Sequence, residues 1–187
     1  MLDSIYISLF KLGGWKLVGE IPSTLKKSLI IVAPHADWVD FPVGLFARAS
    51  LKTKVSFLGK AELFDGFFGF LFRWFGGRPV DRFNNNGIVE SVVKMYREND
   101  ILHIALAPEG TRKPVSKLRT GFYFIALEAQ VPIVMVVFDY PNKRIFAREP
   151  FYLSGNMDED LREIASYYNQ FEGIKKEWIG NYLLEKA

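Results

Sequence analysis

The 187-residue sequence contains no cysteine. This absence excludes thiolate nucleophiles, zinc–thiolate and iron–sulfur sites, and a disulfide scaffold. Long hydrophobic segments are also missing: the longest uncharged run, residues 129–138, is half the ~20 residues that a membrane-spanning helix needs. Asp3 precedes the first apolar stretch and Lys11 interrupts it, a pattern typical of neither a signal peptide nor a transit peptide. We therefore expect a cytoplasmic protein.

The sequence also lacks a strong charge of one sign, because 24 basic residues face 21 acidic ones and the net charge is +3. This balance suits a phosphorylated ligand or an anionic membrane surface and is too weak to indicate nucleic acid binding. Hydrophobic residues make up 49% and charged residues 24%, the proportions of a globular chain and not a disordered one. No repeat, low-complexity tract or linker divides the chain, so we predict a single domain over residues 1–187.

Apolar segments of strand length alternate with segments of helical periodicity. This order predicts an α/β fold: a single domain with a mixed, mostly parallel sheet of about five to seven strands and helices on both faces. The predicted strands are residues 28–33, 54–58, 78–82, 101–107, 132–138 and, at one edge, 143–147. The predicted helices are residues 40–50, 61–75, 86–96, 120–130, 161–168 and 178–184.

The predicted helix at residues 61–75 has an unusually wide apolar face. Its apolar arc covers close to half of the circumference, more than the ~100° that packing on a core requires. We expect one part of the arc to face the core and the rest to contact a bilayer surface or line an acyl channel. The alternative is that the whole arc is buried in the domain. The candidate contact residues are Phe64, Phe67, Phe68, Phe72 and Trp74.

A first polar cluster follows the predicted strand at residues 28–33. His35 lies just past the strand, and Asp40 lies five residues further on, where a helix begins. A carboxylate bonded to one imidazole nitrogen fixes the tautomer and makes the other nitrogen a better base. The pair is therefore a candidate for general base catalysis. Helix capping by Asp37 or Asp40 is the alternative interpretation.

A second cluster, residues 107–113, follows the predicted strand at residues 101–107. Gly110 permits a tight turn, Thr111 offers a hydroxyl, and Arg112 can bind a phosphate through two parallel hydrogen bonds. Glu109 is suited to accept from a ligand hydroxyl or to position the arginine. The alternative interpretation is a surface turn held by a Glu–Arg pair.

Two further features are less specific. Arg78 and Arg82 flank a short extended segment from which either side chain can reach an anion, although a solvated loop is the better explanation of this segment by itself. His103 is the other histidine of the sequence, and it lies in a predicted strand among apolar neighbours. We interpret His103 as structural.

In chain order these clusters resemble the sequence blocks of the glycerophospholipid acyltransferase family, which includes 1-acylglycerol-3-phosphate and glycerol-3-phosphate acyltransferases. The His-x-x-x-x-Asp block of that family matches His35 and Asp40, and its Pro-Glu-Gly-Thr-Arg block matches residues 108–112 without a break. The order and spacing agree over about residues 28–138. Weaker matches are Gly76, Val80 and Arg82 in a second block, Arg119 with Gly121, and residues 131–133 in a last, apolar block.

The resemblance implies an O-acyltransferase of phospholipid biosynthesis, in which a thioester donates a fatty acyl group to a hydroxyl of a phosphorylated glycerol. The implied donor is acyl-CoA or acyl carrier protein, which serves as a co-substrate, and no cofactor or metal is implied. The implied acceptors are, in order of preference, 1-acylglycerol-3-phosphate, glycerol 3-phosphate and a non-glycerol alcohol. We expect the protein to be peripherally associated with the inner face of the membrane.

The resemblance also gives roles to residues. His35 is expected to take the proton of the acceptor hydroxyl while Asp40 orients the imidazole. Because the sequence has neither cysteine nor a Gly-x-Ser-x-Gly motif, we expect direct transfer without an acyl-enzyme. The acceptor phosphate and glycerol are expected to bind Arg82, Glu109, Gly110, Thr111 and Arg112, with Arg112 the strongest candidate. Lys113, Lys117 and Arg119 are candidates for binding the donor, and a solvated basic face is the alternative.

Two other functions fit part of the pattern. A metal-dependent hydrolase can use His35, Asp37 and Asp40, with His103 as a further ligand type, but it leaves residues 108–112 unexplained. A non-enzymatic, peripheral lipid-binding protein explains the aromatic residues, but it leaves the His35–Asp40 pair without a role.

Overall fold

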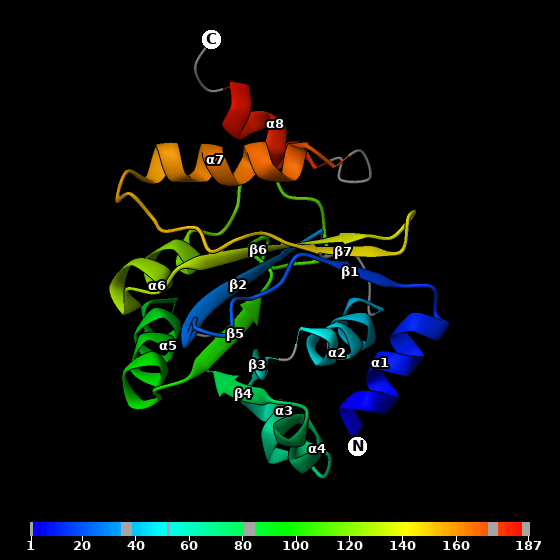
Figure 1. Cartoon of the computed structure of the whole chain (residues 1–187). Helices are drawn as coiled ribbons and strands as arrows, with labels where there is room; N and C mark the ends of the chain where they lie inside the picture. Colours follow the sequence, from blue (N-terminus) through cyan, green and yellow to red (C-terminus); the bar gives the residue numbers. More distant parts are fainter. Residues whose placement is uncertain (1, 35–38, 52, 81–84, 172–175, 185–187) are drawn as a thin grey trace.

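The computed structural model describes residues 2–34, 39–51, 53–80, 85–171 and 176–184 (Figure 1). Side chains are described from residue 4 onward and, in the fourth of these segments, from residue 87. Two of the predicted site residues, His35 and Arg82, lie outside the described residues.

Seven strands form one sheet in the order β1-β7-β6-β2-β5-β3-β4. All neighbouring strands are parallel except β6 and β7, which are antiparallel, so the predicted mixed and mostly parallel sheet is confirmed. The strands are β1 (Lys16–Val18), β2 (Lys27–Ala33), β3 (Val55–Lys60), β4 (Gly77–Val80), β5 (Leu102–Leu106), β6 (Ile133–Asp139) and β7 (Arg144–Ala147).

Residues 144–147 form the predicted strand, but the expectation that it lies at the edge of the sheet is wrong, because β1 pairs with the outer side of β7. The strand β1 has only three residues, Lys-Leu-Val, of which the first and third are exposed. Such a short segment carries too little alternation to be recognised as a strand. The N-terminal helix before it was not predicted either.

Helices cover both faces of the sheet (Figure 1). Side chains of β2 alternate between the two faces, so that Ile30 packs with α1 and α2, while Leu29 and Ile31 pack with α5 to α8. The helices are α1 (Leu2–Leu12), α2 (Asp40–Ser50), α3 (Glu62–Asp65), α4 (Gly69–Trp74), α5 (Asn85–Glu98), α6 (Gly121–Ala129), α7 (Met157–Asn169) and α8 (Glu177–Leu184). The predicted two-sided α/β architecture is confirmed.

The single helix predicted for residues 61–75 is wrong, because α3 and α4 are two short helices separated at Gly66. Gly66 has an extended backbone at the end of α3. The backbone of Gly69 then lies against the carbonyl of Phe64, where an added Cβ would come within 2.0 Å of the oxygen. The apolar pattern therefore continues through a glycine-dependent turn that helical periodicity alone does not reveal.

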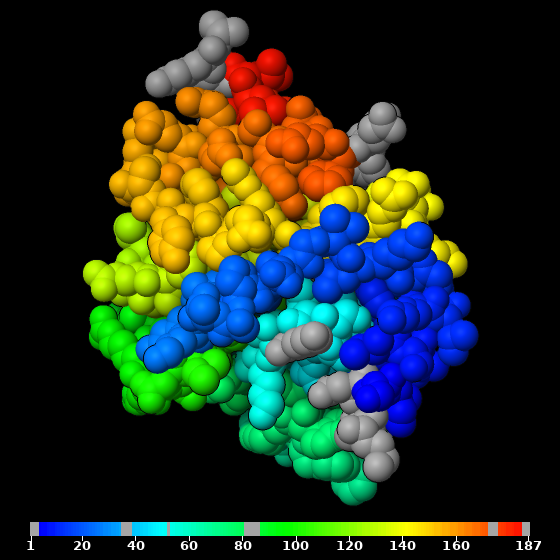
Figure 2. All heavy atoms as spheres, viewed as in Figure 1, coloured from blue at the N-terminus to red at the C-terminus, as the bar shows by residue number. Residues whose placement is uncertain are grey.

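The break divides the aromatic side chains into two groups. Phe64 is buried, with its ring beside Gly59 and Gly77 and the guanidinium of Arg73 over it, so it anchors α3 and α4 to the sheet. Phe72 is half-buried beside it. Phe67, Phe68, Phe70 and Trp74 are exposed. Figure 2 shows this segment at the lower end of the molecule, opposite α7 and α8.

Among the described residues, no helix is both long enough and apolar enough to cross a membrane.

The parallel order brings three polar segments to one edge of the sheet. Asp40 follows β2, residues 107–120 follow β5, and Tyr140 follows β6. Because β2 lies between β5 and β6, these carboxyl ends are neighbours. Ligands of open α/β sheets bind outside such ends, so the topology indicates where a site belongs.

Candidate active site

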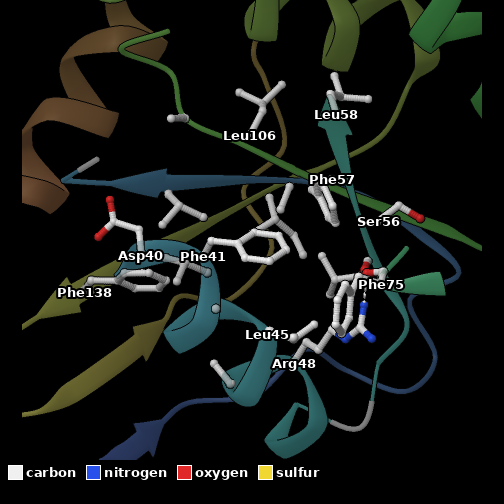
Figure 3. A pocket seen from close by; sticks show the side chains of 18 of the residues that line it. Asp40, Phe41, Leu45, Arg48, Ser56, Phe57, Leu58, Phe75, Leu106 and Phe138 are labelled. Carbon is white, nitrogen blue, oxygen red and sulfur yellow. Dashed lines mark hydrogen bonds between the residues drawn. The ribbon is translucent and has the colours of Figure 1, made fainter. Parts of the chain in front are cut away.

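A cavity of about 460 Å³ lies between α2 and the facing side of β2, β3, β5 and β6. Pockets of this size commonly hold small molecules. Most of the lining is apolar, and Figure 3 shows Asp40 and Phe138 at one end and Arg48 with Phe75 at the other. Its polar lining residues include Asp40, Arg48, Ser56, Arg112 and Arg119, and apolar ones include Phe41, Leu45, Phe57, Phe75 and Phe138.

Asp40 is the first residue of α2 and lines the cavity, although only 7% of its surface is exposed. The N-cap position is Val39, which makes no side-chain cap bond, so capping of α2 by Asp40 is wrong. The hydroxyl of Tyr140 donates a hydrogen bond to Oδ1 of Asp40. The Tyr140 ring contacts the rings of Trp15 and Phe138, which fixes the hydroxyl over the carboxylate. The Asp37 alternative lies outside the described residues.

The segment after β5, residues 108–119, forms a closed loop that we call the anion loop. Its ends are joined by a hydrogen bond from the Arg119 amide to the Pro108 carbonyl, 2.9 Å. Gly110 has a φ of 66°, and a Cβ there would come within 2.4 Å of the Arg119 side chain. Glycine therefore allows both the turn and the close approach of Arg119.

Three residues of the anion loop, Gly110, Arg112 and Arg119, line the same cavity as Asp40. The predicted convergence of an arginine and Asp40 on one cavity is therefore present. Within the described part of the chain, the lining does not include Thr111, Lys113 or Lys117. The Thr111 hydroxyl instead accepts a hydrogen bond from the Lys113 amide, 3.2 Å, and the side chains of Lys113 and Lys117 are exposed.

Glu109 is fully buried, and its carboxylate points to α8 and not to the cavity wall. The indole N–H of Trp178 donates to Glu109 Oε1 over 3.1 Å, and the Lys176 ammonium lies 3.3 Å from the same oxygen. This placement favours a positioning role for Glu109, through the loop that carries Arg112, over contact with a ligand hydroxyl.

Arg48 is a site residue that the sequence analysis missed, whereas Tyr140 could be anticipated from the sequence. The Arg48 guanidinium donates hydrogen bonds to the backbone carbonyls of Val55, over 3.5 Å, and of Phe75. Its side chain lies at the end of the cavity opposite Asp40 (Figure 3). The sequence around Arg48 does not indicate this role, because the groups that bind its side chain are backbone carbonyls of other elements. Tyr140 had a usable signal, since it directly follows a central strand at the carboxyl edge of the sheet.

His103 lies near the amino end of β5, away from the carboxyl ends of the strands where the candidate active site lies. Its Nδ1 is 2.8 Å from the Ser28 hydroxyl, both residues are buried, and burial lowers the pKa of the imidazole. This environment agrees with the structural role predicted for His103. No cluster of three or more metal-ligating side chains occurs within the described residues, which do not include His35 and Asp37.

Comparison with known proteins gives a consistent result. Residues 16–139 match the family model described as Acyltransferase. The whole fold is similar to the crystal structure of the 1-acyl-sn-glycerophosphate (LPA) acyltransferase PlsC from Thermotoga maritima, with a TM-score of 0.56 and 18% sequence identity over 99% of this chain and 79% of that chain. No match is found among curated protein sequences.

Proposed function

Because the chain belongs to the acyltransferase family, we propose that it transfers a fatty acyl group from a thioester to a hydroxyl of a phosphorylated glycerol. The proposed donor is acyl-CoA or acyl carrier protein, and the proposed acceptor is 1-acylglycerol-3-phosphate. The observation that carries this proposal is that Asp40, Arg112 and Arg119 line one cavity whose remaining walls are largely apolar. A lysophospholipid has the same combination of a charged headgroup and an apolar chain.

The proposed reaction is direct transfer. The acceptor oxygen attacks the thioester carbonyl while His35 takes the hydroxyl proton. The new C–O bond forms, the C–S bond breaks, and the imidazolium returns the proton to the leaving thiolate. Asp40 stabilises the imidazolium, and Tyr140 holds the Asp40 carboxylate in place. General base catalysis of this kind contributes ~10²–10⁴-fold to the rate, and the alignment of two bound substrates contributes further.

Arg112 is the proposed ligand of the acceptor phosphate. Arg119, which the sequence analysis took as a candidate for binding the donor, is now proposed as a second ligand of that phosphate because it lines the same cavity. Both lie on the cavity beside Gly110, and a guanidinium can donate two parallel hydrogen bonds to phosphate oxygens. We keep Arg82, Gly110 and Thr111 as proposed neighbours of the phosphate and glycerol. Lys113 and Lys117, exposed on the outer side of the loop, are suited to the phosphates of coenzyme A or to an acidic carrier protein.

The apolar part of the cavity is the proposed site of an acyl chain. It extends along α2 from Asp40 to Arg48, which at 1.5 Å per residue is roughly 12 Å. Phe41, Leu45 and Phe57 provide apolar walls between these ends (Figure 3). At the other end, the guanidinium of Arg48 donates hydrogen bonds to the backbone carbonyls of Val55 and Phe75, so part of its donor capacity is used within the protein.

We also propose that the exposed aromatic side chains of α3 and α4 contact a bilayer surface, with the protein on its cytoplasmic side. Phe67 is 86% and Trp74 is 56% exposed, which is unusual for large apolar residues in adjacent short helices. A second exposed stripe on α1, formed by Ile5, Leu9 and Leu12, has helical spacing. Figure 2 shows both segments toward the lower end of the molecule, away from α8.

The test of acyl transfer is an assay of purified protein over a matrix of acyl-CoA and acyl carrier protein donors with phosphorylated and unphosphorylated acceptors. We expect transfer to 1-acylglycerol-3-phosphate, and its loss in His35→Ala with lipid binding retained. Arg97→Ala, which removes an exposed arginine away from the cavity, is the matched charge control for Arg112→Ala. Absence of transfer for every pair would favour the lipid-binding alternative, and transfer or hydrolysis abolished by EDTA and restored by metal would favour the metal-dependent alternative.

The test of membrane contact is sedimentation with vesicles that contain phosphatidylglycerol. The triple variant Phe67→Ser, Phe68→Ser, Trp74→Ser should lower partitioning at least about tenfold, since burying one such side chain contributes ~1.5–3 kcal/mol. Ile101→Ser combined with Tyr152→Ser is the control, because both residues are exposed elsewhere on the molecule. Equal partitioning of the triple variant and the control would contradict the proposal.

A further inference from the structure

The anion loop is in contact with α8 along much of its length. Trp178 and Lys176 contact Glu109, as described above. In addition, the Asn181 side chain donates a hydrogen bond to the Ser116 carbonyl over 2.8 Å. The Tyr182 hydroxyl accepts a hydrogen bond from the Leu118 amide over 3.3 Å. Trp178, Asn181 and Tyr182 have i, i+3 and i+4 spacing, so one face of α8 makes all three contacts. These residues lie beyond the segment that matches the family model.

The strongest of these contacts involve a buried charge. Glu109 and Trp178 are both fully buried, and Lys176 is largely so. A buried carboxylate is costly without hydrogen-bond donors and an opposite charge, so the loop is held where Trp178 and Lys176 supply them. The carboxylate of Glu109 thus faces α8, while Gly110, Arg112 and Arg119 line the cavity.

The same tryptophan connects the loop to the strands of the candidate active site. The Trp178 ring packs against Tyr168 with 5.7 Å between centroids. The Tyr168 hydroxyl lies 2.9 Å from the Ile31 carbonyl of β2 and 3.3 Å from the Val136 carbonyl of β6. These strands precede Asp40 and Tyr140. A single packed unit therefore connects the loop that carries Arg112 with the elements that carry Asp40.

We propose that α8, with Lys176, is a positioning element for acceptor binding. It holds the Glu109 side of the anion loop so that Arg112 and Arg119 remain on the cavity that Asp40 lines. The proposal rests on the proposed function, because it assigns the phosphorylated acceptor to this loop. Lys176, Trp178 and Asn181 are positioning residues and do not contact substrate.

The test compares Trp178→Phe with Tyr123→Phe. Trp178→Phe removes one hydrogen-bond donor from buried Glu109. Tyr123→Phe removes one donor from buried Asp160 of α7, outside the anion loop, whose carboxylate accepts a 2.9 Å hydrogen bond from the Tyr123 hydroxyl. We expect Trp178→Phe to raise the KM for 1-acylglycerol-3-phosphate about tenfold, as for a lost hydrogen bond to a charged group, with the donor KM unchanged. Tyr123→Phe should lower the unfolding temperature and leave both KM values unchanged.

Amide hydrogen exchange of residues 110–119 gives a readout that needs no turnover. Trp178→Phe should accelerate exchange in this segment, and 1-acylglycerol-3-phosphate should protect it in the wild type far more than in the variant. Lys176→Met, which removes the opposite charge beside Glu109, should produce the same changes, and Asn181→Ala should produce them to a smaller extent. They keep the test valid if Trp178→Phe does not fold.

The outcomes separate the two proposals. If the wild type transfers no acyl group but its loop is protected by the phosphorylated lipid in a Trp178-dependent way, the proposed reaction fails and the positioning role stands. The positioning role is overturned if the variants bind the acceptor as the wild type does, if the lipid does not protect the loop, or if Tyr123→Phe produces the same changes.

Discussion

The two ends of the cavity are built differently. At the Asp40 end, the charged side chains come from segments that follow β2 and β5, and Asp40 itself is held by a hydrogen bond from Tyr140. At the Arg48 end, α2 and β3 supply apolar walls that belong to the regular elements themselves. We expect from this comparison that the proposed chemistry and acceptor recognition depend on the positioning of loops, and that the proposed acyl-chain site depends on the volume between packed elements.

The largest effect is expected for Asp40→Asn, which keeps the shape of the side chain and removes its charge. If Asp40 stabilises the imidazolium, kcat should fall by about 10²–10⁴-fold, the contribution of general base catalysis. Steady-state kinetics with saturating acceptor measure this change. Asp158→Asn, an exposed carboxylate in the first turn of α7, should have no effect. Equal kcat values for the two variants would remove Asp40 from the mechanism.

A smaller effect at the same end is expected for Tyr140→Phe. This change removes the hydrogen bond to Asp40 and keeps the ring contacts with Trp15 and Phe138. Loss of a hydrogen bond to a charged group should lower kcat about tenfold, with little change in the acceptor KM. Tyr152→Phe, at an exposed tyrosine, is the control. A change in KM alone would place Tyr140 in acceptor binding and not in the positioning of Asp40.

The opposite end should respond to volume and not to charge. Leu45→Trp fills part of the apolar cavity, so the preferred acyl donor should become shorter. We expect kcat/KM to fall about fivefold for long-chain donors and to stay nearly unchanged for short-chain donors. Competition between labelled donors measures the ratio. Leu127→Trp on α6 is the control, since Leu127 is exposed on the other side of the sheet. An unchanged chain-length preference would show that the acyl chain lies elsewhere.

The smallest effect is a pH dependence of stability, which we expect from His103. This residue is the neighbour, in the register of β3 and β5, of Val55 in the apolar cavity wall. Burial lowers the pKa of His103, so below about pH 6.5 the unfolded chain takes up a proton that the folded protein does not. The free energy of unfolding should therefore decrease as the pH falls from 6.5 toward 5. Urea denaturation should show a shallower decrease for His103→Asn. Identical pH dependence in the two proteins would mean that His103 does not couple to stability.

The same contrast explains what the sequence could predict. The apolar runs that correspond to β2, β5 and β6 were recognisable, and their order placed Asp40 and the anion loop at one edge of the sheet. The break between α3 and α4 was missed because it depends on the approach of Gly69 to the Phe64 carbonyl. The orientation of Glu109 was missed because its partners, Lys176 and Trp178, are more than 65 residues away and have no local signal.

The central claim is that Arg112 binds a phosphate beside the reacting hydroxyl. The most direct test compares 1-acylglycerol-3-phosphate with the corresponding monoacylglycerol as acceptors for wild type, Arg112→Ala and Arg97→Ala. Our account predicts that wild type and Arg97→Ala prefer the phosphorylated acceptor and that Arg112→Ala loses about 10²-fold of that preference, as expected for a charged, hydrogen-bonded pair. If Arg112→Ala retains the full preference for the phosphorylated acceptor, the claim is contradicted.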